Sequence, residues 1–343
     1  MPDSTAANRL STTPLSLLDL APILQGGSAT DTFHNSLALA QTAERLGYTR
    51  YWLAEHHNMA SIASSATAVL IGYIAGGTAS IRVGSGGIML PNHAPLVVAE
   101  QFGTLASLYP GRIDLGLGRA PGTDPTTAMA LRRSRMETAA DFPDDIRELQ
   151  TYFSAENRAG RVRAIPGEGL DIPIWVLGSS TDSAHLAALY GLPYAFAAHF
   201  APAQLMDALR IYKQRFRPSQ YLSAPYAMAC VNVIAADTDA EAARLATSFY
   251  QLALGIITGQ RRPLPPPVDS MDGLWSAPEE AAVKNMMTHA YIGNGATVRD
   301  RLNAFLELTG VDELMAVAHI FDPAARQHSY EVLMGAKAAD SAG

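Results

Sequence analysis

The chain has 343 residues and a formal net charge of −7, from 25 lysine and arginine residues against 32 aspartate and glutamate residues. This balance does not favour a nucleic-acid partner, and no apolar run approaches the length of a membrane span. The single cysteine, Cys230, excludes an intramolecular disulfide and fits a reducing compartment. We therefore expect a globular cytoplasmic protein that binds neither nucleic acid nor membrane.

Apolar strands and helices alternate along most of the chain. Residues 1–13 are polar and predict a loose N-terminal tail, and the alternation then runs through residues 14–339. The predicted strands are 15–20, 50–54, 81–83, 113–117, 174–177, 194–198, 227–235 and 313–318. The predicted helices are 31–46, 66–76, 95–109, 128–153 with an interruption at Pro143, 182–190, 203–216, 239–258 and 297–308. A last predicted helix begins at Asp322 and Pro323.

Two segments do not follow this alternation. Residues 154–171 are polar and contain Gly160, Pro166 and Gly167, so we predict a loop insertion. Residues 260–277 contain a run of prolines that excludes helix in the first half. This second segment is either a lid or a long surface connection.

Eight strands that alternate with helices favour an α/β fold of the (β/α)8 TIM-barrel type, in a single domain with the two insertions. A doubly wound open sheet is the alternative. We prefer the barrel because polar residues follow many different strands, whereas an open sheet concentrates its site at one switch point.

Barrel sites form at the C-terminal ends of the strands. The residues expected there are Glu55, His56, His57, Ser85, Gly86, Gly87, Arg119, Gly178, Ser179, Ser180, His199 and His319. The glycines at 84, 86 and 87 indicate either a simple bulge or the close approach of a flat ligand.

An anion site is one interpretation of two of these strand ends. Gly178, Ser179 and Ser180 precede a helix, where backbone N–H groups and hydroxyls bind phosphate, although the serines also suit simple helix capping. Arg119 offers a fixed positive charge for a phosphate or carboxylate, or it forms a structural ion pair.

The adjacent histidines at 56 and 57 suit acid–base chemistry. Neighbouring side chains on an extended segment point in opposite directions, so we expect one of them to face the site. A hydrogen-bonded structural histidine is the alternative for either. No third ligand with metal spacing accompanies them in sequence, and we predict no metal site.

Three strings carry a family resemblance: YWLAEHHN at 51–58, VGSGGIMLPNHAPLVVAEQF at 83–102 and GRIDLGLGRAPGTDP at 111–125. Together they resemble the bacterial luciferase-like flavin monooxygenases, most closely the alkanal-monooxygenase-type branch. The resemblance implies a (β/α)8 barrel that binds reduced FMN, usually supplied by a separate flavin reductase. It also implies activation of O2 as a flavin hydroperoxide, oxygenation of a small organic substrate, and a homodimer.

The resemblance assigns roles to individual residues. His56 matches the acid–base histidine, and Gly86 and Gly87 match a pair joined by a non-proline cis peptide under the flavin ring. Arg119 and Ser179 match phosphate ligands, with Ser180 and Ser183 as further candidates. A second phosphate arginine among Arg132, Arg133 and Arg135 is not placed.

One departure from the family pattern affects the expected activity. Gly118 stands where the luciferases carry a reactive cysteine, which makes aldehyde luminescence unexpected. Two alternatives to the monooxygenase stay open. One is deazaflavin-dependent hydride transfer on the same barrel, and the other is a non-catalytic flavin-binding accessory protein.

Overall fold

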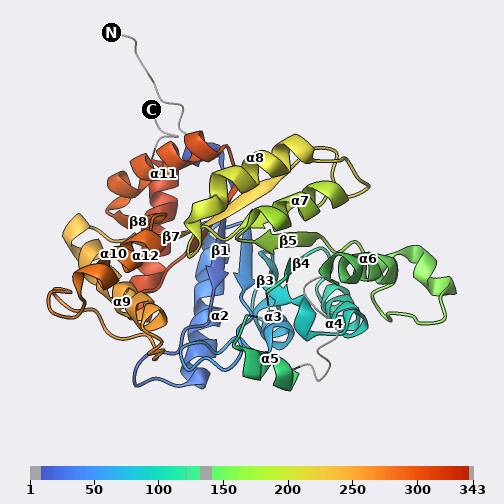
Figure 1. Cartoon of the computed structure of the whole chain (residues 1–343), viewed down its shortest axis with the longest axis horizontal. Coiled ribbons are helices and arrows are strands. Elements are labelled where there is room, and N and C mark those ends of the chain that lie inside the picture. The colour runs from blue at the N-terminus through green and yellow to red at the C-terminus, as the bar shows by residue number, and fades with distance from the viewer. Residues whose placement is uncertain (1–8, 121, 132–140, 340–343) are drawn as a thin grey trace, which may run out of the picture.

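The computed structural model describes residues 9–120, 122–131 and 141–339, and their strands form a closed parallel ring surrounded by helices (Figure 1). Each strand pairs with the next, and the last pairs with the first. The ring consists of β1 (Leu15–Asp19), β2 (Arg50–Leu53), β3 (Arg82–Met89), β4 (Ile113–Gly118), β5 (Ile174–Gly178), β6 (Tyr194–Phe196), β7 (Ala227–Ala235) and β9 (Glu313–Val317). The predicted (β/α)8 barrel is confirmed, and the open sheet is excluded because the ring has no unpaired edge.

Helices cover the outside of the ring and bury its apolar face (Figure 1). They are α1 (Arg9–Thr12), α2 (Ala29–Leu46), α3 (Thr67–Gly76), α4 (Pro95–Leu108), α5 (Pro125–Leu131), α6 (Phe142–Phe153), α7 (Thr181–Tyr190), α8 (Leu205–Arg215), α9 (Asp239–Ile257), α10 (Ala277–Met286), α11 (Gly295–Thr309) and α12 (Pro323–Ala338). Short 3₁₀ turns are η1 (Leu90–Asn92), η2 (Ala155–Ala159) and η3 (Pro202–Gln204).

Local sequence explains where helices begin and end. Ser28 and Asp31 form a capping box at the start of α2, so the helix begins slightly before the predicted residue. Gly47 ends α2 in the left-handed conformation, with φ 82°. Pro143 lies in the first turn of α6, where a missing N–H is tolerated, so it starts this helix and does not interrupt a longer one.

Three elements differ from the predictions. In the predicted loose tail, Arg9–Thr12 form α1 with Leu10 buried, while residues 1–8 lie outside the described residues. Helix α10 was not predicted. Strand β8 (Ala290–Gly293) was also missed, because four residues are too short for a clear pattern. It pairs only with the second half of β7 and stands outside the ring.

Strand β3 continues through the glycines that were predicted to follow it, with a register shift between Ser85 and Ile88. Close packing explains the glycines. A Cβ at Gly87 would lie 2.2 Å from Leu177 Cδ1, and one at Gly116 would lie 2.1 Å from the Ser85 carbonyl oxygen. Side chains larger than hydrogen do not fit this part of the wall.

Large side chains fill the barrel interior, where Trp52 and Trp175 meet edge to face at 5.1 Å. Below them, Arg50 pairs with Asp114 at 2.8 Å and with Glu313 at 2.9 Å, near the N-terminal ends of the strands. These packed and charged side chains fill the barrel at the N-terminal ends of its strands. A ligand site therefore has to form at the opposite rim, where the strands end.

Candidate functional site

His56 follows β2 at the C-terminal rim of the barrel. Its Nδ1 lies 3.2 Å from the carbonyl oxygen of Gly122, which fits a tautomer that donates from Nδ1 and leaves Nε2 as a bare base. Burial lowers the pKa of His56, and this outweighs the Gly122 hydrogen bond and the charge of Glu55. The imidazole is therefore neutral at pH 7 and suited to accept a proton.

Two more neutral histidines lie at the rim, His199 after β6 and His319 after β9. Burial lowers the pKa of each to about 3. The charge of His56 contributes for His199, and the charges of Arg326 and then His199 contribute for His319. Among the described residues, His199 Nδ1 has no hydrogen-bond partner, and neither does the buried Asn232 Oδ1. Both atoms are therefore available for a hydrogen bond with a ligand or a water molecule.

The residues predicted to bind an anion lie at the ends of β4 and β5. Arg119 reaches the first turn of α7 and lies 3.1 Å from Asp182 Oδ2. Ser180 is the N-cap of α7, but its hydroxyl makes no capping hydrogen bond, so the simple capping interpretation does not hold for it. The ion pair with Asp182 thus brings Arg119 to the N-terminal, positive end of a ten-residue helix whose N-cap is Ser180.

The peptide bond between Gly86 and Gly87 is cis, as the resemblance implies. Leu18 and Leu177 pack so closely behind these residues that a Cβ at either position would collide with a leucine. The Ser85 hydroxyl donates to the Gly116 carbonyl at 2.8 Å and accepts from its N–H at 3.0 Å. Ser85 therefore joins β3 to β4, and its hydroxyl is engaged within the wall.

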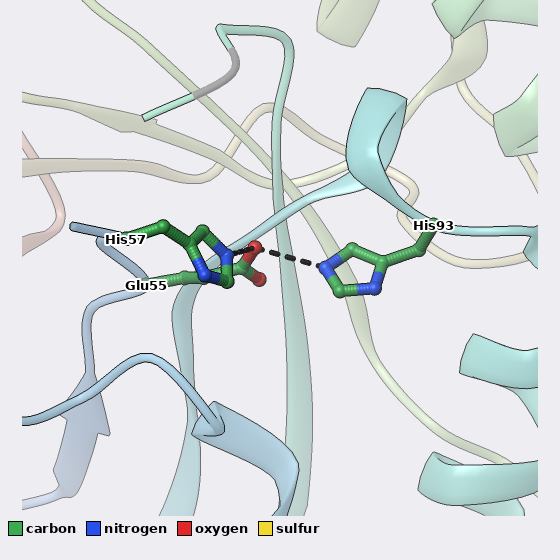
Figure 2. Close-up of side chains that lie close together, drawn as sticks. All are labelled: Glu55, His57 and His93. Carbon is green, nitrogen blue, oxygen red and sulfur yellow. Dashed lines mark hydrogen bonds and ion pairs between the residues drawn. The ribbon is translucent and has the colours of Figure 1, made fainter. Parts of the chain in front are cut away.

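A third group of side chains centres on Glu55, a buried residue that follows β2. Its carboxylate lies between the imidazole rings of His57 and His93 (Figure 2). Sequence reasoning gave His93 no role, because it lies 38 positions after Glu55, at the end of η1. The fold brings the three ligand atoms within 4.8 Å of one another. His56 and His57 have different partners, Gly122 and Glu55.

The proline-rich segment 260–277 is anchored over the β1 side of the rim. Leu264 is fully buried, its N–H donates to the Ile23 carbonyl at 2.8 Å, and its carbonyl accepts from Gln25 at 2.8 Å. The charge of Arg261 contributes to the lowered pKa of His56, so this arginine lies within electrostatic range of the histidine. The sequence did not indicate that Arg261 lies near His56, because contact across the rim depends on the fold.

Some features lie apart from the rim. A hollow of about 600 Å³ is lined by residues of α6, the end of α7 and residues 219–221, away from the strand ends. Arg132, Arg133 and Arg135, the candidates for a second phosphate arginine, fall outside the described residues. Among the described helices, none combines the length and apolar character that crossing a bilayer requires.

Comparison with known proteins gives the family. The sequence matches the luciferase-like monooxygenase family over residues 14–313. It is 53% identical over 326 residues to an Escherichia coli K12 protein named luciferase-like monooxygenase, which covers 95% of this chain and 97% of the relative. It is 37% identical over 253 residues to the Bacillus subtilis N-acetyl-S-alkylcysteine monooxygenase, covering 72% and 75% of the two chains.

Solved structures share the barrel. Apo-MsnO8 matches with a TM-score of 0.85 and 34% identity, over 94% of this chain and 98% of the other. The oxygenating constituent of 3,6-diketocamphane monooxygenase from Pseudomonas putida, solved with FMN, has a TM-score of 0.72 at 21% identity, over 95% and 98%. An F420-dependent secondary alcohol dehydrogenase has a TM-score of 0.65 at 14% identity, over 95% and 99%. The last two show likeness of fold alone, whereas the match over residues 14–313 establishes that this chain belongs to the luciferase-like monooxygenase family.

Proposed function

We propose that this protein is an FMN-dependent monooxygenase that uses reduced flavin and O2 to oxygenate a small organic substrate. The observation that carries the proposal is the convergence at one rim of a helix N-terminus with Arg119, the cis Gly86–Gly87 wall and the neutral base His56. The helix N-terminus with Arg119 suits a phosphate, the Gly86–Gly87 wall suits a flat ring, and His56 suits a position that accepts a proton.

The residues present fit FMN. Arg119, Ser179 and Ser180 would hold its phosphate beside Gly178, the backbone of Gly86 and Gly87 would face its ring, and the orphaned His199 Nδ1 offers a polar contact. Bound reduced FMN would supply two electrons for the activation of O2. The protein would orient the ring, exclude water from the reacting atoms and move a proton at His56 Nε2.

Oxygen uptake with reduced FMN tests the proposal. Faster oxygen uptake with one class of compound in a panel of candidate substrates would support oxygenation. The panel should include N-acetyl-S-alkylcysteines, because a relative is named for them. Deazaflavin binding and turnover without oxygen consumption would support the hydride-transfer alternative, which the F420-dependent fold relative keeps open. Flavin binding without any turnover would support the accessory protein.

Arg119→Ala is expected to weaken reduced-FMN binding by about 1–3 kcal/mol, the loss of a charge-assisted pair with phosphate. Anaerobic titration measures the effect. Asp182→Asn is the informative partner variant, because it removes the carboxylate 3.1 Å from the guanidinium and should preserve or tighten binding. Arg147→Ala, on the exposed side of α6, is the control. Equal affinities for all four proteins would contradict the phosphate assignment.

Residues 14–339 are proposed to form one domain, since strands near both ends, β1 and β9, close the ring. We also propose a cytoplasmic homodimer that receives reduced flavin transiently from a reductase. Large apolar side chains are exposed on α3 and α4, at Val69, Tyr73, Val97 and Leu108, which supports a subunit contact on that flank. Light scattering after size-exclusion chromatography tests it with a Val69→Lys variant.

A further inference from the structure

The Glu55 carboxylate makes three hydrogen bonds although its side chain is only 1% exposed. Its Oε1 lies 2.8 Å from His57 Nε2 and 2.9 Å from His93 Nε2 (Figure 2). Its Oε2 accepts from the Met89 N–H at 3.1 Å. The three partners come from the chain after β2, from the end of β3 and from the end of η1. Glu55 therefore connects segments of the rim that are distant in sequence.

These contacts fix where the protons lie. Burial raises the pKa of Glu55, but the hydrogen bonds from His93, His57 and the Met89 N–H hold it below its ordinary value. The carboxylate is ionised and accepts hydrogen bonds only, so the Nε2 of each ring carries a proton. In a neutral ring the other nitrogen, Nδ1, then carries no proton, and in His93 it lies on the far side of the ring from the carboxylate (Figure 2).

The distances favour shared protons over a bound metal. Two ligands on a tetrahedral zinc ion with bonds of about 2.0 Å lie about 3.3 Å apart. Here both nitrogens lie within 2.9 Å of the same oxygen, which is hydrogen-bond length. Both rings also keep part of their surface open, with side-chain exposures of 13% for His57 and 26% for His93, so water or a ligand reaches them.

We propose that Glu55, His57 and His93 form a second proton-transfer site at the rim, in which Glu55 is a positioning residue that presents the two Nδ1 atoms as bases. One ring accepts a proton at Nδ1 and becomes an imidazolium that keeps its Nε2–H bond to Glu55. The same Nδ1 returns the proton to water or to a reacting group. Between these steps the net charge of the site changes from −1 to zero.

The neighbouring charges fit this exchange. His56 is close enough for Glu55 and His57 to affect its titration, and Arg261 acts on His56 from segment 260–277. A positive charge at His57 therefore disfavours protonation of His56 and favours its neutral form.

Histidine-selective ¹⁵N NMR of the full-length protein without flavin tests the positioning role directly. Above the titration range, we expect two rings with protonated Nε2 and bare Nδ1, assigned by their loss in His57→Asn and His93→Asn. Glu55→Gln should change the tautomer populations of both rings. Asp237→Asn is the matched control, because it removes the carboxylate 2.8 Å from the exposed His328 and should change that ring alone. Rings protonated at Nδ1, or unaffected by Glu55→Gln, would overturn the proposal.

Two further measurements separate this role from other roles of the same residues. Titration of zinc or cobalt into the flavin-free protein should show no stoichiometric binding, and tight one-to-one binding lost in Glu55→Gln would identify a metal site instead. In the flavin-loaded enzyme, Glu55→Gln should lower kcat about 10- to 100-fold with an altered pH profile. The Glu55→Gln/His57→Asn double variant should be no slower than the slower single variant. A uniform loss with an unchanged profile would indicate a structural role only.

Discussion

Replacing His56 with alanine is expected to lower the turnover number about 10²- to 10⁴-fold, the usual contribution of a positioned acid–base group. Affinity for reduced FMN should change little, because the imidazole contacts Gly122 and not the proposed phosphate ligand Arg119. Single-turnover kinetics with the substrate found in the oxygen-uptake panel, together with flavin titration, separate the two quantities. His328→Ala on α12, remote from the rim, is the control.

The pH profile of the same variant adds a second criterion. The reaction needs His56 in its neutral form, and burial lowers its pKa below the ordinary value of 6.5. Activity that depends on this base is therefore retained at pH 6.5 and falls only as pH drops through the lowered value. The acid limb should disappear in His56→Ala. If flavin binding collapses instead, the histidine is structural.

Asp19→Asn is expected to destabilise the fold by about 3–5 kcal/mol, the range for breaking one partner of a buried ion pair. Asp19 is fully buried at the end of β1 and accepts from Arg326 at 2.9 Å, Ser36 at 2.6 Å and Tyr51 at 2.5 Å. Its removal leaves the buried guanidinium of Arg326 without a counter-charge. The midpoint of urea unfolding measures the change, and Asp207→Asn, from an exposed pair with Arg210, should leave it nearly unchanged.

The stabilisation from Asp19 has a defined pH dependence. Burial raises its pKa, but the Arg326 charge and the hydrogen bonds outweigh burial and hold the pKa below 3.8. A carboxyl group with a lower pKa in the folded state contributes fully above the unfolded value and loses its contribution as pH falls. The stability difference between wild type and Asp19→Asn should therefore shrink below pH 3.8. A difference that is constant down to the acid transition would contradict this ionic account.

The sequence predicted the eight ring strands because each is a compact apolar run between turn residues. It also predicted α2 closely, because Asp31 and Gly47 mark its ends locally. Similarly, the position of Arg119 after a strand and of Ser180 before a helix is a local pattern. The prediction failed where the pattern was short or absent, as for the four residues of β8 and for α1 in the polar tail.

Local periodicity and end signals in the sequence thus determined the order of the elements, the barrel class and the set of polar residues that follow the strands. Only the tertiary structure decided which of these residues meet. It joined Glu55 to His93 across 38 positions, placed Arg119 beside Asp182, and engaged the Ser85 hydroxyl within the wall. The physical reason is that secondary structure follows from interactions within a few residues, whereas a hydrogen bond between two rim segments depends on how strand tilt and register close the ring.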